Sequence, residues 1–344
     1  MGAAGGGAAA ALKRLQSFDI RARPRRGPPR AQAYHRSMFF TDHSRGFDCA
    51  EDPEVVRFGD RYFMYYVLAP GDGVKRLPWN IGIAVSDDLD RFEKVAELGA
   101  ADLGQHNGIA VGSVLVHRGK VHLFYFSYGS GANDSVCLAT SDDGLWFTPH
   151  PQNPIFRAIG EWNCGRAVSP HVVRVGDRWR MYACTRDPDM TRQSIVLAEA
   201  AVSSDLGPGA WQQLGSGELF GPELAWEHES TESPSLIEHE GRWYMFYGGG
   251  YWTRPQQIGC AMSVDGVRWV RLAREPLLPY QSGANGMPLE RASPSVFRDH
   301  DGSVHLFVQE SADRGRNWRV VRFPVRWEGG RPVIDAGQGA RPPV

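Results

Sequence analysis

Five glycines recur along the chain at nearly equal intervals, and this spacing constrains the fold more than any other feature of the sequence. Their successive separations are 60, 57, 65 and 61 residues, and they are Gly59, Gly119, Gly176, Gly241 and Gly302. Each lies between two short runs rich in β-branched and aromatic residues, beginning with residues 54–58 and 62–66. Two such runs around a glycine turn are typical of a β-hairpin. The chain therefore repeats one hairpin unit five times.

A third β-prone run follows each hairpin, and in several units an aromatic fourth run follows a polar turn. Two of these turns are Ser141-Asp142-Asp143-Gly144 and Ser263-Val264-Asp265-Gly266. A sheet this small cannot bury both of its faces alone, so five such sheets must stack face to face in a ring. The sequence predicts an all-β fold, a five-bladed β-propeller with four antiparallel strands per blade. Two separate β-sandwiches, the alternative, would not give so uniform a spacing.

The two ends of the chain complete this plan. Residues 37–40, followed by Thr41, form a plausible outer strand that completes the last blade from the N-terminal side. Residues 1–33 differ from the rest, because a Gly/Ala run is followed by a segment rich in Arg and Pro. Such a composition buries too little apolar surface to order itself, and it lacks the continuous apolar core of a secretory signal. We expect a disordered leader over residues 1–33 and a single propeller domain over residues 34–335.

Composition argues against several classes of partner. A net charge of −1 over 344 residues gives no electrostatic footprint for nucleic acid or for an anionic membrane. No apolar run approaches the length of a membrane span. The five cysteines are scattered and form no C-x-x-C motif, which argues against a disulfide framework or a thiolate zinc site. No metal-ligand spacing is present. We therefore expect no cofactor, no metal and a cytoplasmic location.

The segments that precede the five hairpins, here called the blade heads, are the best lead to function. In a propeller blade the first strand runs along the central channel, and the heads of all blades meet at one mouth of it, where they line a concave pocket. The heads read Glu51-Asp52-Pro53, Val111-Gly112-Ser113, Val168-Ser169-Pro170, Glu232-Ser233-Pro234 and Ala292-Ser293-Pro294. Proline there has a structural use, since it makes the entry to the strand rigid.

Acids distinguish two of these heads from the others. Asp52 stands where three heads have Ser, and Glu51 and Glu232 stand where the other three have a small apolar residue. Acids in such a mouth are costly unless they are paired, solvated or used in chemistry. A structural ion pair with Arg166 or Arg291 is the alternative to a functional role.

The heads and the hairpin of residues 51–66 resemble the five-bladed propeller glycoside hydrolases, namely arabinanases, β-xylosidases and arabinofuranosidases, with invertases and levansucrases as relatives. The resemblance covers roughly residues 45–330. It implies an Asp at the first head, which Asp52 matches, and a Glu in a Glu-x-Pro head as general acid, which Glu232 matches. Two departures stand out. The family acid sits on the third blade, where this chain has Val168, and the family's second-blade Asp is replaced by Ser113 or Gly112.

Glycosidic cleavage needs one carboxyl to protonate the leaving oxygen and a second to activate water or attack directly. We assign Asp52 as base or nucleophile and Glu232 as acid, with a pKa raised by burial against Tyr251 or Trp252. Sugar binding needs flat apolar faces and placed polar groups. The candidates for substrate binding flank the heads: Glu51, Trp79, His106, Asn107, Trp162, Asn163, Arg166, His171, Asp187, Tyr251, Trp252 and Arg291. For each one alone, packing or a surface pair is the alternative.

The sequence thus predicts a glycosidase that cleaves a small glycoside by a two-carboxylate mechanism in the central pocket. Two alternatives stay open. A propeller that binds sugar without hydrolysing it would account for the missing second-blade acid. A phosphorylase-like relative would gather several arginines at the mouth, for which Arg166, Arg186, Arg254 and Arg291 are available.

Overall fold

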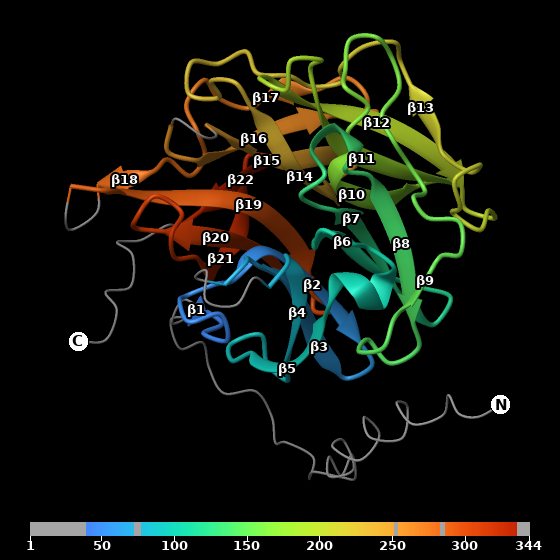
Figure 1. Ribbon diagram of the computed structural model, residues 1–344. Coiled ribbons are helices and arrows are strands. Elements are labelled where there is room, and N and C mark those ends of the chain that lie inside the picture. The colour runs from blue at the N-terminus through green and yellow to red at the C-terminus, as the bar shows by residue number, and fades with distance from the viewer. Residues whose placement is uncertain (1–38, 72–76, 251–253, 283–285, 336–344) are drawn as a thin grey trace, which may run out of the picture. The chain divides into compact units, whose positions relative to one another are not determined.

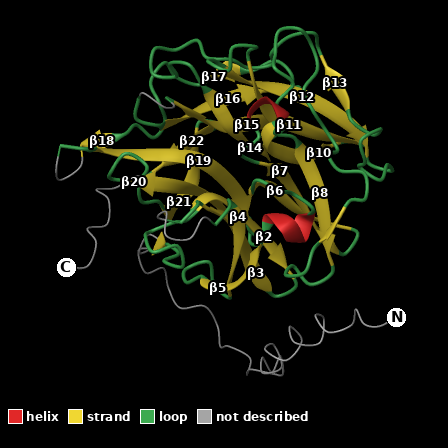
Figure 2. Cartoon of the chain, viewed as in Figure 1, coloured by secondary structure: helices red, strands yellow, loops and turns green. Residues whose placement is uncertain are grey.

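The structure is a computed structural model that describes residues 39–71, 77–250, 254–282 and 286–335. Over these residues the chain forms five antiparallel sheets, which follow one another in sequence. They belong to the compact unit Ser37–Val344. The predicted leader, residues 1–33, lies outside the described residues. Strands dominate, and the helices in the described ranges are two short 3-10 turns, η1 (Ala100–Leu103) and η2 (Gly131–Asn133) (Figure 2).

The first four sheets each contain four strands that pair in chain order. Blade one has β2 (Glu51–Phe58), β3 (Arg61–Leu68), β4 (Asn80–Ser86) and β5 (Glu93–Leu98). Blade two has β6 (Ile109–His117), β7 (Lys120–Ser127), β8 (Val136–Ser141) and β9 (Thr148–Pro149). Blade three has β10 (Val168–Val175), β11 (Arg178–Arg186), β12 (Gln193–Ala201) and β13 (Gln212–Leu214). Blade four has β14 (Thr231–His239), β15 (Arg242–Gly249), β16 (Gln257–Ser263) and β17 (Val270–Arg271).

Blade five closes the ring with both ends of the domain. Its central strands are β19 (Pro288–Arg298), β20 (Val304–Ser311) and β21 (Arg319–Glu328), with β18 (Gln281–Ser282), β22 (Arg331–Ile334) and β1 (Phe39–Phe40) at the edges. Phe39 pairs with Val321 and Phe40 with Val320. The expectation that the N-terminal segment completes the last blade is thus confirmed for these two residues. At the other edge, β18 and β19 form an arm that reaches out from the blade (Figure 1).

The innermost strands contact one another in the cyclic order β2, β6, β10, β14, β19 and back to β2. This order is that of a five-bladed propeller, as the glycine spacing predicted (Figure 1). All five turn glycines have a positive φ, between 61° at Gly59 and 87° at Gly302. Only glycine adopts that region without steric cost, which is why the repeat is visible in the sequence.

Buried tyrosines join neighbouring blades at the polar turns that the sequence repeats. The Tyr65 hydroxyl of blade one donates to the carbonyl oxygen of Gly144 in blade two, at 2.9 Å. The Tyr182 hydroxyl of blade three donates in the same way to Gly266 in blade four, at 2.7 Å. Both tyrosines are fully buried. The recurring Asp-Gly turns therefore serve the stacking of blades, apart from their role within each sheet.

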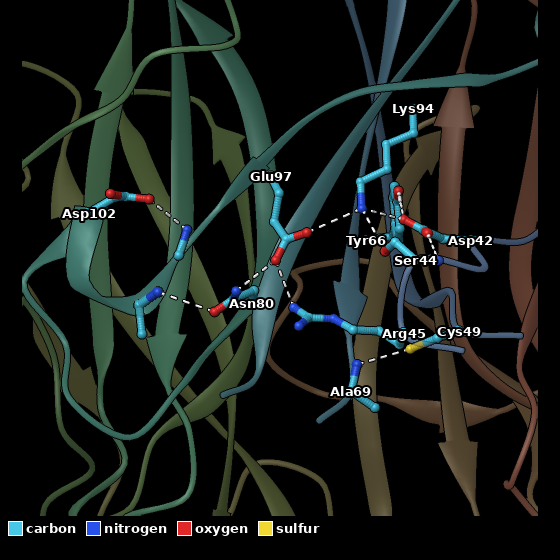
Figure 3. Close-up of polar contacts among 12 residues, drawn as sticks. Asp42, Ser44, Arg45, Cys49, Tyr66, Ala69, Asn80, Lys94, Glu97 and Asp102 are labelled. Carbon is cyan, nitrogen blue, oxygen red and sulfur yellow. Dashed lines mark hydrogen bonds and ion pairs between the residues drawn. The ribbon is translucent and has the colours of Figure 1, made fainter. Parts of the chain in front are cut away.

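A network of ion pairs fixes the segment that leads from β1 to β2 (Figure 3). Asp42 accepts hydrogen bonds from the Tyr66 hydroxyl at 2.6 Å and lies 2.8 Å from Lys94 Nζ. Glu97 accepts from Arg45 at 2.7 Å and from Lys94 at 3.2 Å. Because this segment runs directly into the first blade head, the network holds the start of β2 in place.

Two kinds of feature are absent from the described residues. They contain no helix that is both long and apolar enough to cross a membrane. They also contain no group of three or more His, Cys, Asp or Glu side chains placed to hold a metal ion. All five cysteines are unpaired.

Candidate active site

The blade heads lie within the innermost strands, rather than before them as the sequence suggested. In all five blades the pairing with the second strand skips residues at the head: two residues in the four heads that contain proline, as between Glu51 and Glu54, and one residue, Gly112, in blade two. The residue before the proline has a positive φ of 45° to 47° in all four: Asp52, Ser169, Ser233 and Ser293. A bulge with a left-handed residue re-aims a side chain out of the normal alternation. Asp52 is therefore presented by a backbone feature that three serines share.

A cavity of about 750 Å³ lies at the mouth where these heads meet. This volume lies within the range of small-molecule sites. Five of the predicted site residues line it: Glu51, Asp52, Trp79, Arg166 and Glu232. Below the heads, a cavity of only about 20 Å³ continues between the prolines of blades one, four and five. The large cavity is therefore the place where a substrate and both predicted catalytic carboxyls can meet.

Seven other candidates within the described ranges do not line this cavity: His106, Asn107, Trp162, Asn163, His171, Asp187 and Arg291. Tyr251 and Trp252 lie outside the described residues. Arg291 is buried and its Nε lies 3.1 Å from Glu310 Oε1, a structural ion pair of the kind considered above. Asp187 accepts hydrogen bonds from the backbone of Thr191 and Arg192 and so closes its own loop.

His171 belongs to a second layer just below the heads. Burial lowers the pKa of His171 to about 4, and its ring makes a backbone hydrogen bond at Leu236 in the next blade. The equivalent residue of blade two, Ser113, accepts from the Val172 backbone N–H at 3.1 Å, and Ser235 of blade four accepts from Val296 at 2.9 Å. These side chains link consecutive innermost strands, which is a structural use.

Asp52 is held by two residues of blade five. Its Oδ1 accepts a hydrogen bond from the Ser293 hydroxyl, and its backbone N–H donates to Gln309 Oε1 at 2.6 Å. Burial raises the pKa of Asp52 to about 6, and the Ser293 hydrogen bond opposes this by stabilising the carboxylate. Above pH 6 Asp52 is therefore ionised, as a base or nucleophile requires.

Glu232 is 9% exposed, and its Oε2 accepts a hydrogen bond from Gln193 Nε2 at 2.6 Å. Burial, followed by the negative charge of Asp52, raises the pKa of Glu232 to about 7. The nearby guanidinium groups of Arg186 and Arg166 act in the opposite direction. Below pH 7 Glu232 is therefore protonated, as a general acid requires.

Glu51 lies next to Asp52 in the sequence and lines the same cavity. Burial, with a further contribution from the charge of Asp52, raises the pKa of Glu51 well above its usual range. Burial therefore favours the protonated form of Glu51, which can donate a hydrogen bond to a sugar oxygen.

Arg186 and Arg254, which the sequence offered for a phosphate, also line the cavity. Several residues that line the cavity or hold the carboxyls were not among the sequence candidates: Tyr128, Gln193, Glu290, Ser293, Gln309 and Arg314. Ser293 could have been found, because it occupies the aligned head position of Asp52. Gln193 begins a third strand and lies outside the heads, so the alignment of the heads did not mark it.

Comparison with known proteins agrees with this architecture. Residues 49–206 match the sequence profile of the glycosyl hydrolases family 32 N-terminal domain. A thermostable family-43 glycoside hydrolase superposes with a TM-score of 0.69 at 18% identity, over 88% of this chain and 98% of that one. The family 32 β-fructofuranosidase of Bombyx mori gives 0.66 at 16% identity, over 88% of this chain and 66% of that one. An endo-1,4-β-xylanase of Bacteroides thetaiotaomicron gives 0.66 at 20% identity, over 85% and 96%.

These structural likenesses establish the fold, and the family profile ties the first half of the propeller to hydrolases in particular. The profile covers the first head, the whole of blades one and two and the first three strands of blade three. The chain is thus a five-bladed propeller with the fold that these glycoside hydrolases share, and the profile match over residues 49–206 indicates a glycosidase.

Proposed function

We propose that this chain hydrolyses a small glycoside in the cavity at the propeller mouth, with Asp52 as base or nucleophile and Glu232 as general acid. One observation supports this most strongly. The two carboxyls line one cavity, and burial raises the pKa of both, to about 6 for Asp52 and about 7 for Glu232, with the charge of Asp52 adding to the rise at Glu232. Cleavage of a glycosidic bond needs two carboxyls at one site, one that supplies a proton and one that acts as base or nucleophile.

The rest of the cavity suits a sugar. The rings of Trp79 and Tyr128 meet edge to face with centroids 5.0 Å apart, and both residues line the cavity. Aromatic faces of this kind accept the C–H surface of a pyranose or furanose. Arg166 lies with its guanidinium carbon 5.9 Å from the Tyr128 ring centre. A variant of the Bombyx mori enzyme has been crystallised with sucrose, a glycoside small enough for a cavity of about 750 Å³.

We propose a small-molecule glycoside as the partner, and no nucleic acid, in keeping with the net charge of −1. We also propose a cytoplasmic location, which five unpaired cysteines support, since a reducing compartment keeps thiols free.

The test uses two substrates that differ in leaving group. Asp52→Asn should lower the hydrolysis of both an alkyl and a dinitrophenyl glycoside by roughly 10³-fold or more. Glu232→Gln should have a comparable effect on the alkyl glycoside and a much smaller one on the dinitrophenyl glycoside, because that leaving group needs no proton. Glu93→Gln, at an exposed position of β5, is the matched control.

Wild-type rates in both variants would refute the assignment. Tight sugar binding with no turnover on a broad panel of glycosides would instead favour the non-hydrolytic binding protein.

Phosphorolysis is a second candidate, and two arginines favour it. Arg254 and Arg314 line the cavity, are exposed, and form no ion pair with any residue that the structure describes. In this reaction a phosphate oxygen bonds to the anomeric carbon, the glycosidic bond breaks, and the leaving oxygen takes the proton of Glu232. Inorganic phosphate should then give a sugar 1-phosphate as product. Free sugar alone, at every phosphate concentration, would exclude this candidate.

A further inference from the structure

Gln193 occupies a fixed position between two blades, next to the proposed acid. It is the first residue of β12, only 3% exposed, and its backbone N–H donates to the Glu229 carbonyl oxygen at 2.8 Å. Glu229 lies two residues before β14, the strand that carries Glu232. The backbone of Gln193 is therefore tied to the same segment as the carboxyl that its side chain contacts.

Two guanidinium groups determine which way the Gln193 amide faces. Its Oε1 accepts from Arg186 Nε at 3.0 Å and from Arg166 Nη1 at 3.4 Å, while its Nε2 donates to Glu232 Oε2 at 2.6 Å. A guanidinium has only donors, so the reversed amide would set N–H groups against N–H groups. The Gln193 amide is therefore fixed in the orientation that donates to Glu232, whatever the protonation state of that acid.

We propose that Gln193 is a positioning residue which occupies Oε2 of Glu232 and so confines the catalytic proton to Oε1. This inference rests on the proposed function of Glu232 as general acid. An oxygen that already accepts a short hydrogen bond from an amide is a poor place for a proton. A proton on Oε2 would crowd the amide hydrogen of Gln193 in the short gap between Oε2 and Nε2. The acid is left with one oxygen from which to protonate the leaving group.

The Gln193 hydrogen bond also affects the pKa of Glu232, and its effect is opposite to that of the second-blade Asp in the propeller glycoside hydrolases that the sequence resembles. The second-blade Asp that the family uses would repel the carboxylate, whereas an amide donor stabilises it. Here burial and the charge of Asp52 raise the pKa of Glu232, and the Gln193 hydrogen bond limits that rise. Besides these, the charged or titratable groups that act on Glu232 or respond to it are Arg166, Arg186 and the Cys184 thiol.

Blade two still contributes a carboxylate, which contacts Arg166 rather than Glu232 itself. Arg166 Nε lies 3.3 Å from Asp134 Oδ2, and both side chains are almost completely buried. Asp134 in turn accepts from the Ser130 backbone N–H at 2.8 Å. A continuous line of contacts therefore runs from Asp134 in blade two through Arg166 and Gln193 to Glu232 in blade four. It orients the amide without bringing a second negative charge to the acid.

The decisive variant is Gln193→Glu, which keeps an oxygen for the two arginines and replaces the donor towards Glu232 by an acceptor. The titration of Glu232 is followed by carbon-13 NMR of protein labelled at glutamate carboxyls, with the signal assigned by its loss in Glu232→Gln. We expect the midpoint to rise by about one pH unit or more, and the basic limb of the pH–rate profile to move with it. The control is Gln212→Glu, the same change at an exposed position of β13.

An unmoved Glu232 midpoint in folded Gln193→Glu protein would overturn the proposal, even if the rate fell. Should that variant not fold, Gln193→Met removes the donor at similar volume and is read in the same way. The NMR measurement needs no turnover. A shifted midpoint in a protein without any glycosidase activity would therefore refute the proposed function and leave the link between Gln193 and Glu232 standing.

Discussion

The heads of blades one and four have nearly the same backbone and place their acids differently. Both are bulged, and the residue before the proline has a φ of 45° in Asp52 and 47° in Ser233. Blade one carries an acid at that bulged position, and blade four carries one a residue earlier, at Glu232. The backbone therefore delivers side chains to the mouth without deciding their chemistry. The neighbours decide it, since a serine hydroxyl contacts Asp52 and an amide contacts Glu232.

Glu51 and Glu232 hold the same place in their heads, and the facing strand separates their roles. Glu51 pairs with Val67, whereas Glu232 pairs with Gly248. A Cβ added at Gly248 would lie 3.2 Å from Glu232 Cγ, which is tighter than ordinary contact. The glycine gives the Glu232 side chain room to lie across its neighbour and reach Gln193. A glutamate in one head position thus has different surroundings in two blades, because one residue on the opposite strand differs.

Gly248→Ala tests this difference, and it carries the largest effect that we expect from a residue without a functional group. The added methyl should displace the Glu232 carboxyl and lower kcat by roughly 10- to 100-fold, since misplacement of about 1 Å in an active site can cost that much. Steady-state kinetics on an alkyl glycoside measures the loss, and thermal unfolding checks the fold.

Gly217→Ala is the matched control, because Gly217 is exposed and a Cβ there meets no atom within 4 Å. Equal rates for the two variants would mean that Glu232 tolerates displacement, and the comparison between blades one and four would lose its functional meaning.

The fold was predictable because the repeated unit contains residues whose type is required by the local backbone conformation. The turn glycines need a positive φ, and prolines mark the heads of four of the five innermost strands. Alignment of the heads was also enough to single out Asp52 and Glu232, whose side chains line one cavity. Their catalytic roles stay predictions. These features are local, so one sequence contains all of the information that they require.

The surroundings of the two acids were not predictable in the same way. Proximity in sequence to a head suggested Arg291, but side chains alternate along a strand, and Glu290 lines the cavity while Arg291 pairs with Glu310 beneath it. Asn107 lies beside a strand and bonds to Ser130 in the neighbouring loop. The contact between Gln193 and Glu232 joins residues 39 positions apart in two blades. It depends on how the blades stack, which no local pattern records.

Ser293→Ala tests the surroundings of the acid in blade one, because the Ser293 hydroxyl contacts Asp52. Loss of the hydroxyl donor should raise the pKa of Asp52 further above about 6, because the carboxylate loses a stabilising hydrogen bond. The acid limb of the pH–rate profile should move up by about one pH unit, with about a tenfold loss of rate below that limb and little loss near the optimum.

Ser169→Ala is the matched control, since Ser169 has the same head position and a φ of 45°, whereas the hydroxyl that contacts Asp52 is that of Ser293. A profile that moves equally in both variants would show that the strained backbone, rather than the hydroxyl, sets the acidity of Asp52.

The last prediction concerns stability rather than rate, and it distinguishes the two acids by pH. A carboxyl whose pKa is higher in the folded protein than in the unfolded chain lowers stability above both values, and this cost disappears below the unfolded value. For Glu232 the two values are about 7 and 4.5, which corresponds to roughly 3 kcal/mol at alkaline pH. For Asp52 they are about 6 and 3.8, so its window lies lower.

Glu232→Gln should therefore unfold at a higher urea concentration than the wild type at pH 8, with the gap closing as the pH falls from about 7 to 4.5. Asp52→Asn should show its own gap closing between about 6 and 3.8, and Glu93→Gln, at an exposed position, should show none. Urea unfolding from pH 4 to 8 measures all three. If the Glu232→Gln gap were constant with pH, Glu232 would not titrate in the folded protein near neutrality. The division of roles between the heads of blades one and four would then need another basis, because it depends on Glu232 keeping its proton at a pH where Asp52 has lost its own.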